Sequence, residues 1–568
     1  MKDKTIVAGI ILLSLCLNVV GITWGLPDRW NVDEVVASAL KMAHNRQITP
    51  EGDTTHPTFY HFFLMVFLGL YILFLKFTGY PLSAAVSSAS VSWINFVNTD
   101  PFLASSLYIV ARTVSALLGA GMVFIVYLIT KRIYGRRAGL FSALILTLSA
   151  GFIADNHYAK SSALVNFLSV FAVYFCIKAV YDDKFRRDFL IASLLGGLAL
   201  ATKFNGGIVV LPLITAYLYH YAASHPYNNS SVSYCLKYIR NLISSGMVLR
   251  SLIFYLLGFF IGFPAIFLHF ARYVPSFIFY KKNYFIGYSS FGVRIINFLH
   301  NIIAYIHLIA DMYGVFLFLI VFYGLVIAIR NKNQGKSIIL SLIIPYFLIM
   351  SSSQILKYPN AKYIILIIPF LSIFGGLFVN RLIESQKIAR GLKYLFLSAG
   401  LTLSFIYAAS TEMIFIKEDI RYLTTRWIEE NIPHDSSIEI FSELDWYFSS
   451  RLLKEYNVVF FGTDSKNAAN TSQFKVWNDD EKVKEYFREL NIKGPKSDFL
   501  ILSSVDFIED IFKNLREEER TIFLNNLIKG KWGYAEIKRI SYDDKAIFSH
   551  IIDYTPRYIL ILKKTGKH

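Results

Sequence analysis

The sequence predicts an all-α polytopic membrane domain followed by a small soluble α/β domain. Of the 568 residues, 55% are hydrophobic and only 17% are charged, which is too apolar for a chain of soluble domains. Apolar runs of about 20 residues, the length that crosses roughly 30 Å of hydrocarbon, recur up to residue 413. Beyond that point charged residues of both signs alternate with short segments of β type, which predicts a second domain over 414–568.

The net charge of +17 belongs to the apolar part of the chain. Residues 1–413 carry 33 Lys and Arg against 14 Asp and Glu, whereas residues 414–568 carry 24 against 26. A basic surplus between apolar spans is typical of cytoplasmic loops, so we expect no nucleic acid as a partner. The partner that the composition indicates is the lipid bilayer.

Eleven apolar runs have the length of transmembrane helices. The first, residues 5–24, follows a short basic start, and no small-residue cleavage site precedes Trp24, so we expect a retained signal-anchor helix. The other ten are centred near residues 117, 146, 171, 196, 214, 260, 320, 345, 371 and 404.

The short loops predict the orientation, because Lys and Arg resist translocation. Five loops are markedly basic, and all five lie on the side of the N-terminus if residues 25–103 form one long external loop. We therefore expect an integral protein of the plasma membrane or an equivalent membrane, with a cytoplasmic N-terminus and an extracytoplasmic C-terminal domain. The basic residues are Lys131, Arg132, Arg136, Arg137, Lys184, Arg186, Arg187, Lys237, Arg240, Arg250, Arg330, Lys332, Lys336, Arg381, Lys387, Arg390 and Lys393.

Residues 57–77 are apolar enough to span the membrane alone. Counting this run as a single crossing would invert every later loop, against the charge pattern. We expect an in-plane or re-entrant helix within the first external loop. The alternative is a true span paired with a second, weaker one near residues 81–97.

The C-terminal domain shows four short strand-like runs, at residues 437–441, 457–461, 498–502 and 558–562. Helical periodicity separates them at residues 479–490 and 506–528. Strands that alternate with helices indicate a small α/β domain.

Two acids directly after the first span are the strongest candidates for chemistry. Asn31 is a plausible N-cap, which would place Asp33 and Glu34 in the first turn of a helix at the membrane surface. Two acids at a helix N-terminus also complement the helix dipole, which is the structural alternative. About twenty residues later, His56 and Pro57 lead into an apolar aromatic run.

This arrangement resembles the C-type glycosyltransferases, in the branch of the protein O-mannosyltransferases and the aminoarabinose transferase. The Asp-Glu pair and the His-Pro motif match that branch in order. Further segments similar to it are Ala111-Arg112-Thr113-Val114, Lys131-Arg132-Ile133-Tyr134-Gly135, His157-Tyr158-Ala159-Lys160-Ser161, Thr202-Lys203-Phe204-Asn205-Gly206 and Ala361-Lys362-Tyr363. The resemblance covers about 400 residues and implies a membrane fold of the same kind.

The resemblance also implies an enzyme that moves a sugar, with inversion, from a polyprenyl-phosphate carrier such as dolichyl phosphate to an acceptor outside the cytoplasm. Asp33 is expected to accept the proton of the attacking hydroxyl, and Glu34 to orient it or an acceptor group. The leaving phosphate gains negative charge and needs cations, for which we expect Arg112, Lys160, Lys203 and Lys362. Further residues expected to bind substrate are His56, His157 and Tyr363.

Each expectation has an alternative. The three lysines could snorkel into the headgroups from helix ends, and Arg112 could pair with a structural acid. We predict no metal ligand set: His44, His56 and His61 with Glu51 and Asp53 have no zinc spacing, although a divalent metal cofactor stays open. A multi-pass lipid or glycan transporter or flippase is the alternative function, but it would show repeated halves, whereas charges and long loops here gather on one face.

Overall fold

The fold is seen in a computed structural model. It describes residues 2–28, 31, 33–50, 56–82, 96–97, 99–225, 240–242, 244–280, 291–353, 360–440, 456–460, 488, 491–503, 522–523, 525–527, 529–541 and 558–565. The chain divides into two compact units. The first is Met1–Ile22, Asp33–Leu73 and Ile109–Met413, and the second is Thr23–Val32, Phe74–Tyr108 and Ile414–His568.

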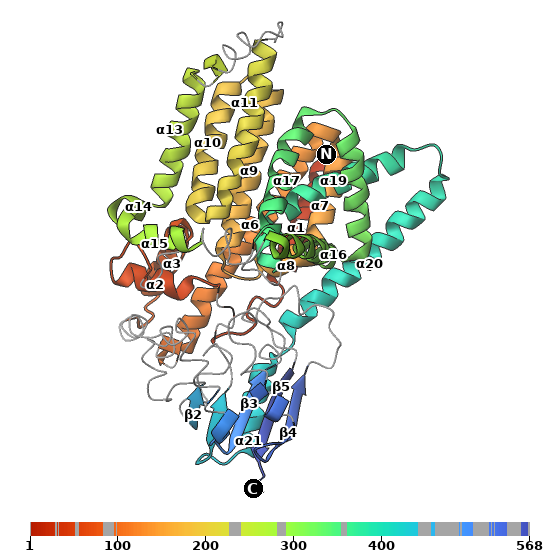
Figure 1. The fold of residues 1–568 in the computed structure, drawn as a ribbon. Helices are drawn as coiled ribbons and strands as arrows, with labels where there is room; N and C mark the ends of the chain where they lie inside the picture. Colours follow the sequence, from red (N-terminus) through yellow and green to blue (C-terminus); the bar gives the residue numbers. More distant parts are fainter. Residues whose placement is uncertain are drawn as a thin grey trace. The chain divides into compact units, whose positions relative to one another are not determined.

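Long apolar helices build the first unit (Figure 1). By length and composition, eight helices of the described residues can cross a membrane, or up to nine if the bent pair α7–α8 counts as one span. The chain is therefore a multi-pass membrane protein, as predicted. The helices are α1 (Lys2–Val19), α2 (Val36–His44), α3 (Phe59–Phe77), α6 (Pro101–Tyr134), α7 (Arg136–Thr147), α8 (Ala150–Asn156), α9 (Ser161–Tyr181), α10 (Phe185–Thr202), η1 (Phe204–Val209), α11 (Val210–Ser224), α13 (Gly246–Gly262), α14 (Ala265–Leu268), α15 (Phe270–Tyr280), α16 (Phe291–Arg330), α17 (Gln334–Ser351), α18 (Ala361–Ile364), η3 (Ile365–Ile367), α19 (Ile368–Glu384) and α20 (Arg390–Ile416).

Each of the eleven predicted runs coincides with a helix, but not every run is a full span. Two of these helices, α1 and α13, are shorter apolar helices, and α10 begins with charged residues. Conversely, the run at residues 57–77 forms α3, whose 19 residues and hydropathy of 1.9 suit a span. By these measures eight or nine helices of the described residues qualify as spans, against eleven predicted, and a helix is present at residues 59–77. Its in-plane or re-entrant placement stays a prediction.

Small residues let the helices approach closely, as is common in membranes. A Cβ atom built on Gly197 of α10 would lie 1.9 Å from the carbonyl oxygen of Tyr255 in α13. In return, one built on Gly258 of α13 would lie 2.3 Å from the carbonyl oxygen of Leu194. Only glycine fits at these two points, so the contact between α10 and α13 depends on both.

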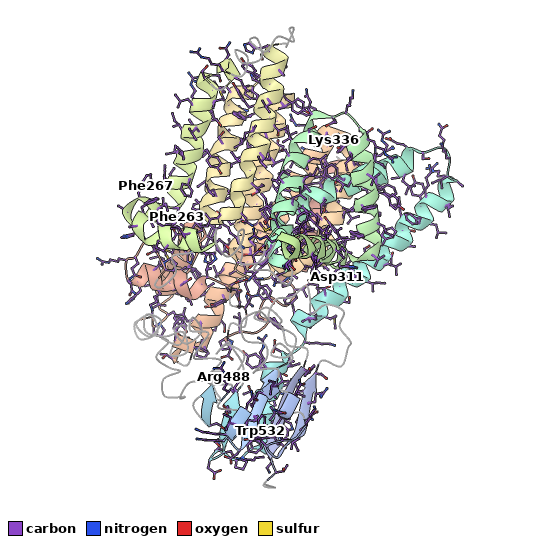
Figure 2. All side chains as sticks on the ribbon, in the orientation of Figure 1. Phe263, Phe267, Asp311, Lys336, Arg488 and Trp532 are labelled. Atoms are coloured by element: carbon purple, nitrogen blue, oxygen red, sulfur yellow. The ribbon has the colours of Figure 1, made fainter. Side chains whose placement is uncertain are left out.

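The predicted basic loops meet at one end of this unit. The Tyr181 hydroxyl donates to Asn333 Oδ1 at 3.2 Å, which joins the end of α9 to the start of α17. Arg132, at the end of α6, pairs with Asp182. Lys336 lies at the end of the bundle where the N-terminus is marked (Figures 1 and 2). The three basic loops near residues 132, 182 and 333 therefore lie at one end of this unit, together with the N-terminus.

A five-stranded mixed sheet forms the core of the second unit, with strand order β2-β1-β3-β5-β4. Strand β1 is parallel to β2 and β3, and β5 is antiparallel to β3 and β4. Helix α21 (Ile420–Asn431) packs with the apolar cluster that contains Ile438 and Ile501. The strands are β1 (Ser437–Ile440), β2 (Asn457–Phe460), β3 (Phe499–Ser503), β4 (Tyr534–Ser541) and β5 (Tyr558–Lys564).

Four of these strands lie where the sequence predicts them, which confirms an α/β domain after the membrane helices. Strand β4 and helix α21 were missed. Strand β4 is an edge strand with five consecutive exposed residues, so it lacks the apolar alternation that reveals the others. Of the helix predicted at residues 479–490, all but Arg488 lie outside the described residues, as does most of the one predicted at 506–528.

Candidate active site

The two predicted acids lie in an irregular segment between α1 and α2. Asp33 is in a turn, Glu34 forms an isolated bridge, and α2 begins only at Val36. The expectation that Asn31 caps a helix containing both acids was therefore wrong. The N-cap position belongs to Val35, whose side chain cannot accept a hydrogen bond. The reason is a competing backbone pairing with the segment after α8.

That pairing fixes Glu34. An isolated antiparallel bridge joins Glu34 to Lys160, and Glu34 Oε1 accepts from the Ala159 amide at 2.9 Å. Arg112 of α6 donates from Nε to Oε1 and from Nη2 to Oε2 of Glu34, both at 2.8 Å. Its Nη1 donates to the Ile22 carbonyl, also at 2.8 Å. Glu34 and Arg112 thus form a fully buried, bidentate ion pair.

This pair corrects two expectations. The carboxylate of Glu34 is directed at Arg112 and the Ala159 amide, so it does not orient Asp33 or an acceptor in this structure. The guanidinium of Arg112 is 2% exposed and engaged on three nitrogens, so it is not open to a phosphate. The structural alternative given for Arg112, pairing with an acid, is the one that the structure shows.

Asp33 faces lysines instead. Lys362 Nζ lies 3.3 Å from Asp33 Oδ2, and the Asp33 side chain keeps 32% of its surface exposed. Burial alone would raise the pKa of the Asp33 carboxyl, but the charges of Lys362, Lys160 and Lys203 outweigh it and hold that pKa below its ordinary value. Asp33 is therefore an ionised carboxylate that retains access to an incoming molecule.

The three lysines come from three different helix ends. Lys160 precedes α9 and is 5% exposed, with its ammonium 4.6 Å from the centre of the Tyr158 ring. Arg112 lies over the same ring at 5.7 Å, so this ring carries two cations. Lys203 follows α10, and burial lowers its pKa although the charge of Asp33 opposes that change.

Hydrogen bonds join the loops that carry Lys203 and Lys362. The Asn205 amide donates to the Tyr346 hydroxyl at 2.9 Å, and this hydroxyl donates to the Tyr363 carbonyl at 2.7 Å. Gly206 permits the tight turn after α10, because a Cβ there would lie 2.4 Å from the Ala199 carbonyl oxygen. The Lys362 amide is capped by Asn360 Oδ1 at 2.9 Å.

His157 has a structural position. Its Nδ1 lies 2.9 Å from the Ile153 carbonyl, and its Nε2 lies 2.7 Å from the Val20 carbonyl and 3.2 Å from Glu412 Oε2. Burial would lower the pKa of His157, but Glu412 and the two carbonyls raise it above its ordinary value. The imidazolium thus ties α8, the end of α1 and α20 together, and the expectation that it contacts substrate was wrong for this structure.

Two other expected substrate residues are more open. His56 is exposed at the start of the segment leading to α3. Tyr363 is half-buried beside Lys362, whose ammonium lies 5.5 Å from the ring centre. The structure therefore places Tyr363 beside Lys362 and leaves His56 at the surface.

The sequence analysis gave no role to Asp155 or Tyr158. Asp155 is 8% exposed, accepts from the Ser162 hydroxyl at 2.9 Å, and acts electrostatically on Lys203. The sequence signal for Asp155 was its place five residues before Lys160, in the segment that was expected to be external. Tyr158 was also apparent in the sequence, but nothing in the residue spacing indicated that two cations would lie over its ring.

Among the residues that the structure describes, no three His, Cys, Asp or Glu side chains come together as a metal site would require. Glu51 and Asp53, which the sequence analysis considered with three histidines, lie outside those residues.

Comparisons with known proteins agree with the sequence resemblance. The family described as dolichyl-phosphate-mannose-protein mannosyltransferase matches residues 92–253. No curated protein matches the sequence. ArnT from Cupriavidus metallidurans, bound to undecaprenyl phosphate, is 13% identical with a TM-score of 0.50, covering 98% of this chain and 97% of that one.

ArnT in the apo state gives 14% identity and the same TM-score, with 99% and 98% covered. At this identity the likeness concerns the fold, and it extends over both units of the chain. The predicted resemblance is thus supported in two ways: residues 92–253 match the mannosyltransferase family, and the chain has the fold of ArnT.

Proposed function

We propose that the protein transfers a sugar from a polyprenyl-phosphate donor to an acceptor hydroxyl on the extracytoplasmic face, with inversion at the anomeric carbon. One observation carries the proposal: an ionised, partly exposed carboxylate, Asp33, stands among Lys160, Lys203 and Lys362 where four helix ends meet. This combination supplies both groups that the reaction requires, a proton acceptor and cations for a leaving phosphate.

The lysines hold the donor phosphate. The three lysine ammonium groups lie near two carboxylates, those of Asp33 and Asp155. This leaves one net positive charge around Asp33. A sugar-phosphate diester carries one negative charge, and its leaving phosphate carries more, so the lysines favour the product side of the bond cleavage. The undecaprenyl phosphate bound to ArnT, which has the same fold, supports a carrier lipid of this class.

Asp33 acts on the acceptor. The acceptor oxygen attacks the anomeric carbon from the face opposite the phosphate, and the carbon–phosphate oxygen bond breaks with its electron pair leaving on the phosphate. The proton of the acceptor hydroxyl passes to Asp33. The reaction is a single displacement at the anomeric carbon, so the configuration inverts.

Donor binding also raises the proton affinity of Asp33, the proposed base. Lys362 Nζ lies 3.3 Å from Asp33 Oδ2. A phosphate that draws this ammonium away weakens the attraction that keeps the pKa of Asp33 low, so proton affinity rises when the donor is in place. Glu34 and Arg112 contribute by position, since their buried pair fixes the backbone next to Asp33.

The direct test is glycosyl transfer by purified protein, offered a panel of radiolabelled polyprenyl-phosphate sugars. Asp33→Asn preserves size but removes proton acceptance, so turnover should fall roughly 10²- to 10⁴-fold with donor binding retained. The matched control is Asp182→Asn, which removes a carboxylate from a partly exposed pair among the basic loops. Near-normal transfer by Asp33→Asn would remove the mechanism, and a product that retains the donor's anomeric configuration would exclude inversion.

The proposed side of the membrane has a separate test. With Cys16, Cys176 and Cys235 replaced, Lys538→Cys in exposed β4 should react with an impermeant thiol reagent in intact cells. Lys332→Cys, in a basic loop, should react only after lysis. The opposite labelling pattern would invert the orientation.

A further inference from the structure

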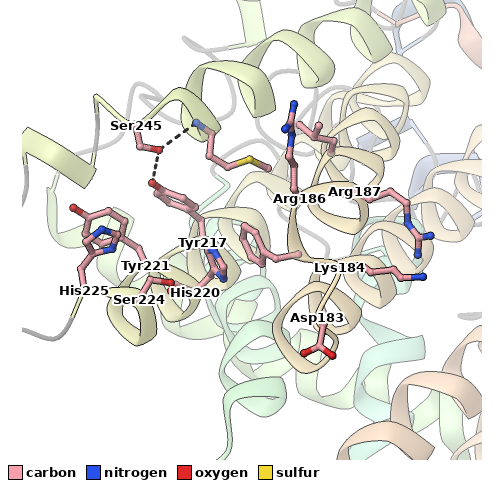
Figure 3. Close-up of a pocket in the computed structure, with 13 residues that line it drawn as sticks. Asp183, Lys184, Arg186, Arg187, Tyr217, His220, Tyr221, Ser224, His225 and Ser245 are labelled. Atoms are coloured by element: carbon pink, nitrogen blue, oxygen red, sulfur yellow. Dashed lines mark hydrogen bonds between the residues drawn. The ribbon is translucent and has the colours of Figure 1, made fainter.

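A pocket of about 670 Å³ lies at the end of the bundle away from Asp33 (Figure 3). It is formed where α10 begins, α11 ends and α13 begins. Helix α10 runs from this pocket to Lys203 over 18 residues, which at 1.5 Å per residue is about 27 Å. The pocket is thus distinct from the candidate active site.

Two cations that make no ion pair among the described residues line the pocket, together with the exposed carboxylate of Asp183. Asp188 neutralises two neighbours, because Arg187 Nε donates to it at 2.9 Å and Lys178 Nζ lies 3.2 Å away. Lys184 and Arg186 are exposed and, within the described ranges, make no ion pair. In Figure 3, Arg186 lies on the side where Ser245 is found and Lys184 on the other. Their charges are therefore available to an anion.

Aromatic rings with polar edges also line the pocket. His220 stacks on Phe185 with ring centres 3.5 Å apart, and His225 stacks on Tyr221 at 4.4 Å. The Tyr217 hydroxyl donates to Ser245 Oγ at 2.6 Å. Rings that are apolar on one side and polar on the other are typical of the headgroup level of a membrane.

The N-terminus of α13 adds to the positive field of the pocket. Ser245 caps this 17-residue helix by accepting from the Met247 and Val248 amides, at 3.2 and 3.4 Å. The positive end of the helix dipole therefore lies at the pocket, on the side of Arg186.

The helices that lead away from the pocket present apolar side chains outward. On α11, Ile214 and Leu218 are 49% and 44% exposed, and on α13, Leu249 and Leu252 are 60% and 51% exposed. In a bilayer these faces contact acyl chains. A ligand seated here would have its charged end among the cations and its chain along the helices, as a membrane lipid does.

We propose that this pocket binds the phosphate headgroup of an anionic membrane lipid, on the face of the protein opposite the active site. The proposal does not rest on glycosyl transfer. It depends on the pocket, on the free cations Lys184 and Arg186, and on the apolar faces of α11 and α13.

The test measures lipid binding to the full-length protein in detergent by native mass spectrometry. The probes are dioctanoyl phosphatidylglycerol, dioctanoyl phosphatidylcholine and inorganic phosphate. The double variant Lys184→Gln/Arg186→Gln removes the two free charges. Arg330→Gln/Lys332→Gln is the matched control, because it removes two exposed charges from another basic loop.

Wild type and control should bind the anionic lipid more tightly than the zwitterionic one. In the pocket variant the Kd for the anionic lipid should rise about 30-fold, close to 2 kcal/mol at 1.4 kcal/mol per tenfold change. Equal losses in the pocket and control variants would overturn the proposal, because they indicate general surface charge. Equal affinity for the two lipids, or inorganic phosphate as tight as the anionic lipid, would also overturn it.

Discussion

The buried pair of Glu34 and Arg112 makes a prediction that differs from ordinary active-site mutagenesis. Glu34→Gln keeps the shape of the side chain but leaves the Arg112 guanidinium uncompensated, at 2% exposure. Breaking a buried pair from one side costs about 3–5 kcal/mol, because the remaining charge has lost both its water and its partner. We therefore expect Glu34→Gln to lower stability, and to lower activity through the displaced backbone at Asp33.

A double-mutant cycle tests this reasoning. Arg112→Met keeps the apolar stem, so Glu34→Gln/Arg112→Met removes both charges and should cost less than the sum of the single changes by about 2–3 kcal/mol. The control is Arg132→Met, whose pair with Asp182 is partly exposed and should contribute at most about 1 kcal/mol.

The assay is unfolding in mixed micelles with increasing SDS, followed by tryptophan fluorescence on protein that elutes as one species. Additive losses for Glu34→Gln and Arg112→Met would show that the two side chains are not coupled, and would refute the pair as a fixed support of the site. A Glu34→Gln protein as stable as wild type would refute it as well.

Three further changes have defined outcomes. Lys362→Met should raise the donor KM. It also removes a charge that lowers the pKa of Asp33, so the acid limb of the kcat/KM profile should move to higher pH. An unmoved profile would show that Lys362 does not influence the protonation of Asp33. His157 has a folded-state pKa above its unfolded value near 6.5, so its stabilising contribution is complete below about pH 6.5 and is lost as pH rises through the folded pKa. Thermal stability measured against pH should show this loss in wild type, and the same loss in His157→Gln would assign it to another group. Gly197→Ala should destabilise the protein in thermal unfolding, because the added Cβ would lie 1.9 Å from a backbone oxygen. The control Gly9→Ala should not, because nothing lies within 4 Å of its added Cβ. Equal unfolding temperatures for the two variants would argue against the close contact.

The membrane helices were predictable because each needs only a local run of apolar residues. The same holds for strand β5, whose apolar residues are contiguous, and for β1, where apolar and polar residues alternate. The charged edge strand β4 could not be found this way, since pairing with β5 rather than its own composition makes it a strand.

The candidate site likewise combines residues that the sequence predicts with contacts that it does not predict. Its lysines were predictable, because Lys160, Lys203 and Lys362 each stand beside a helix end on the expected external side. Which basic side chain pairs with Asp33 and which with Glu34 was not predictable. Whether Arg112 meets Asp33 or Glu34 depends on a backbone bridge from Glu34 to Lys160, two positions far apart in the chain, and a single sequence gives no register for it.

The wide spacing of the site along the chain has a consequence for its biogenesis. Arg112 emerges from the ribosome 78 residues after Glu34, so its acidic partner is already present when the charge must enter the membrane. The interval between the synthesis of Asp33 and that of its partner Lys362 is much longer, since the two are 329 residues apart. At 5–20 residues per second this is roughly 16–66 s of synthesis. A ribosome that stalls before α18 therefore leaves an inserted but incomplete protein, whose Asp33 carboxylate lacks the ammonium of Lys362 opposite it.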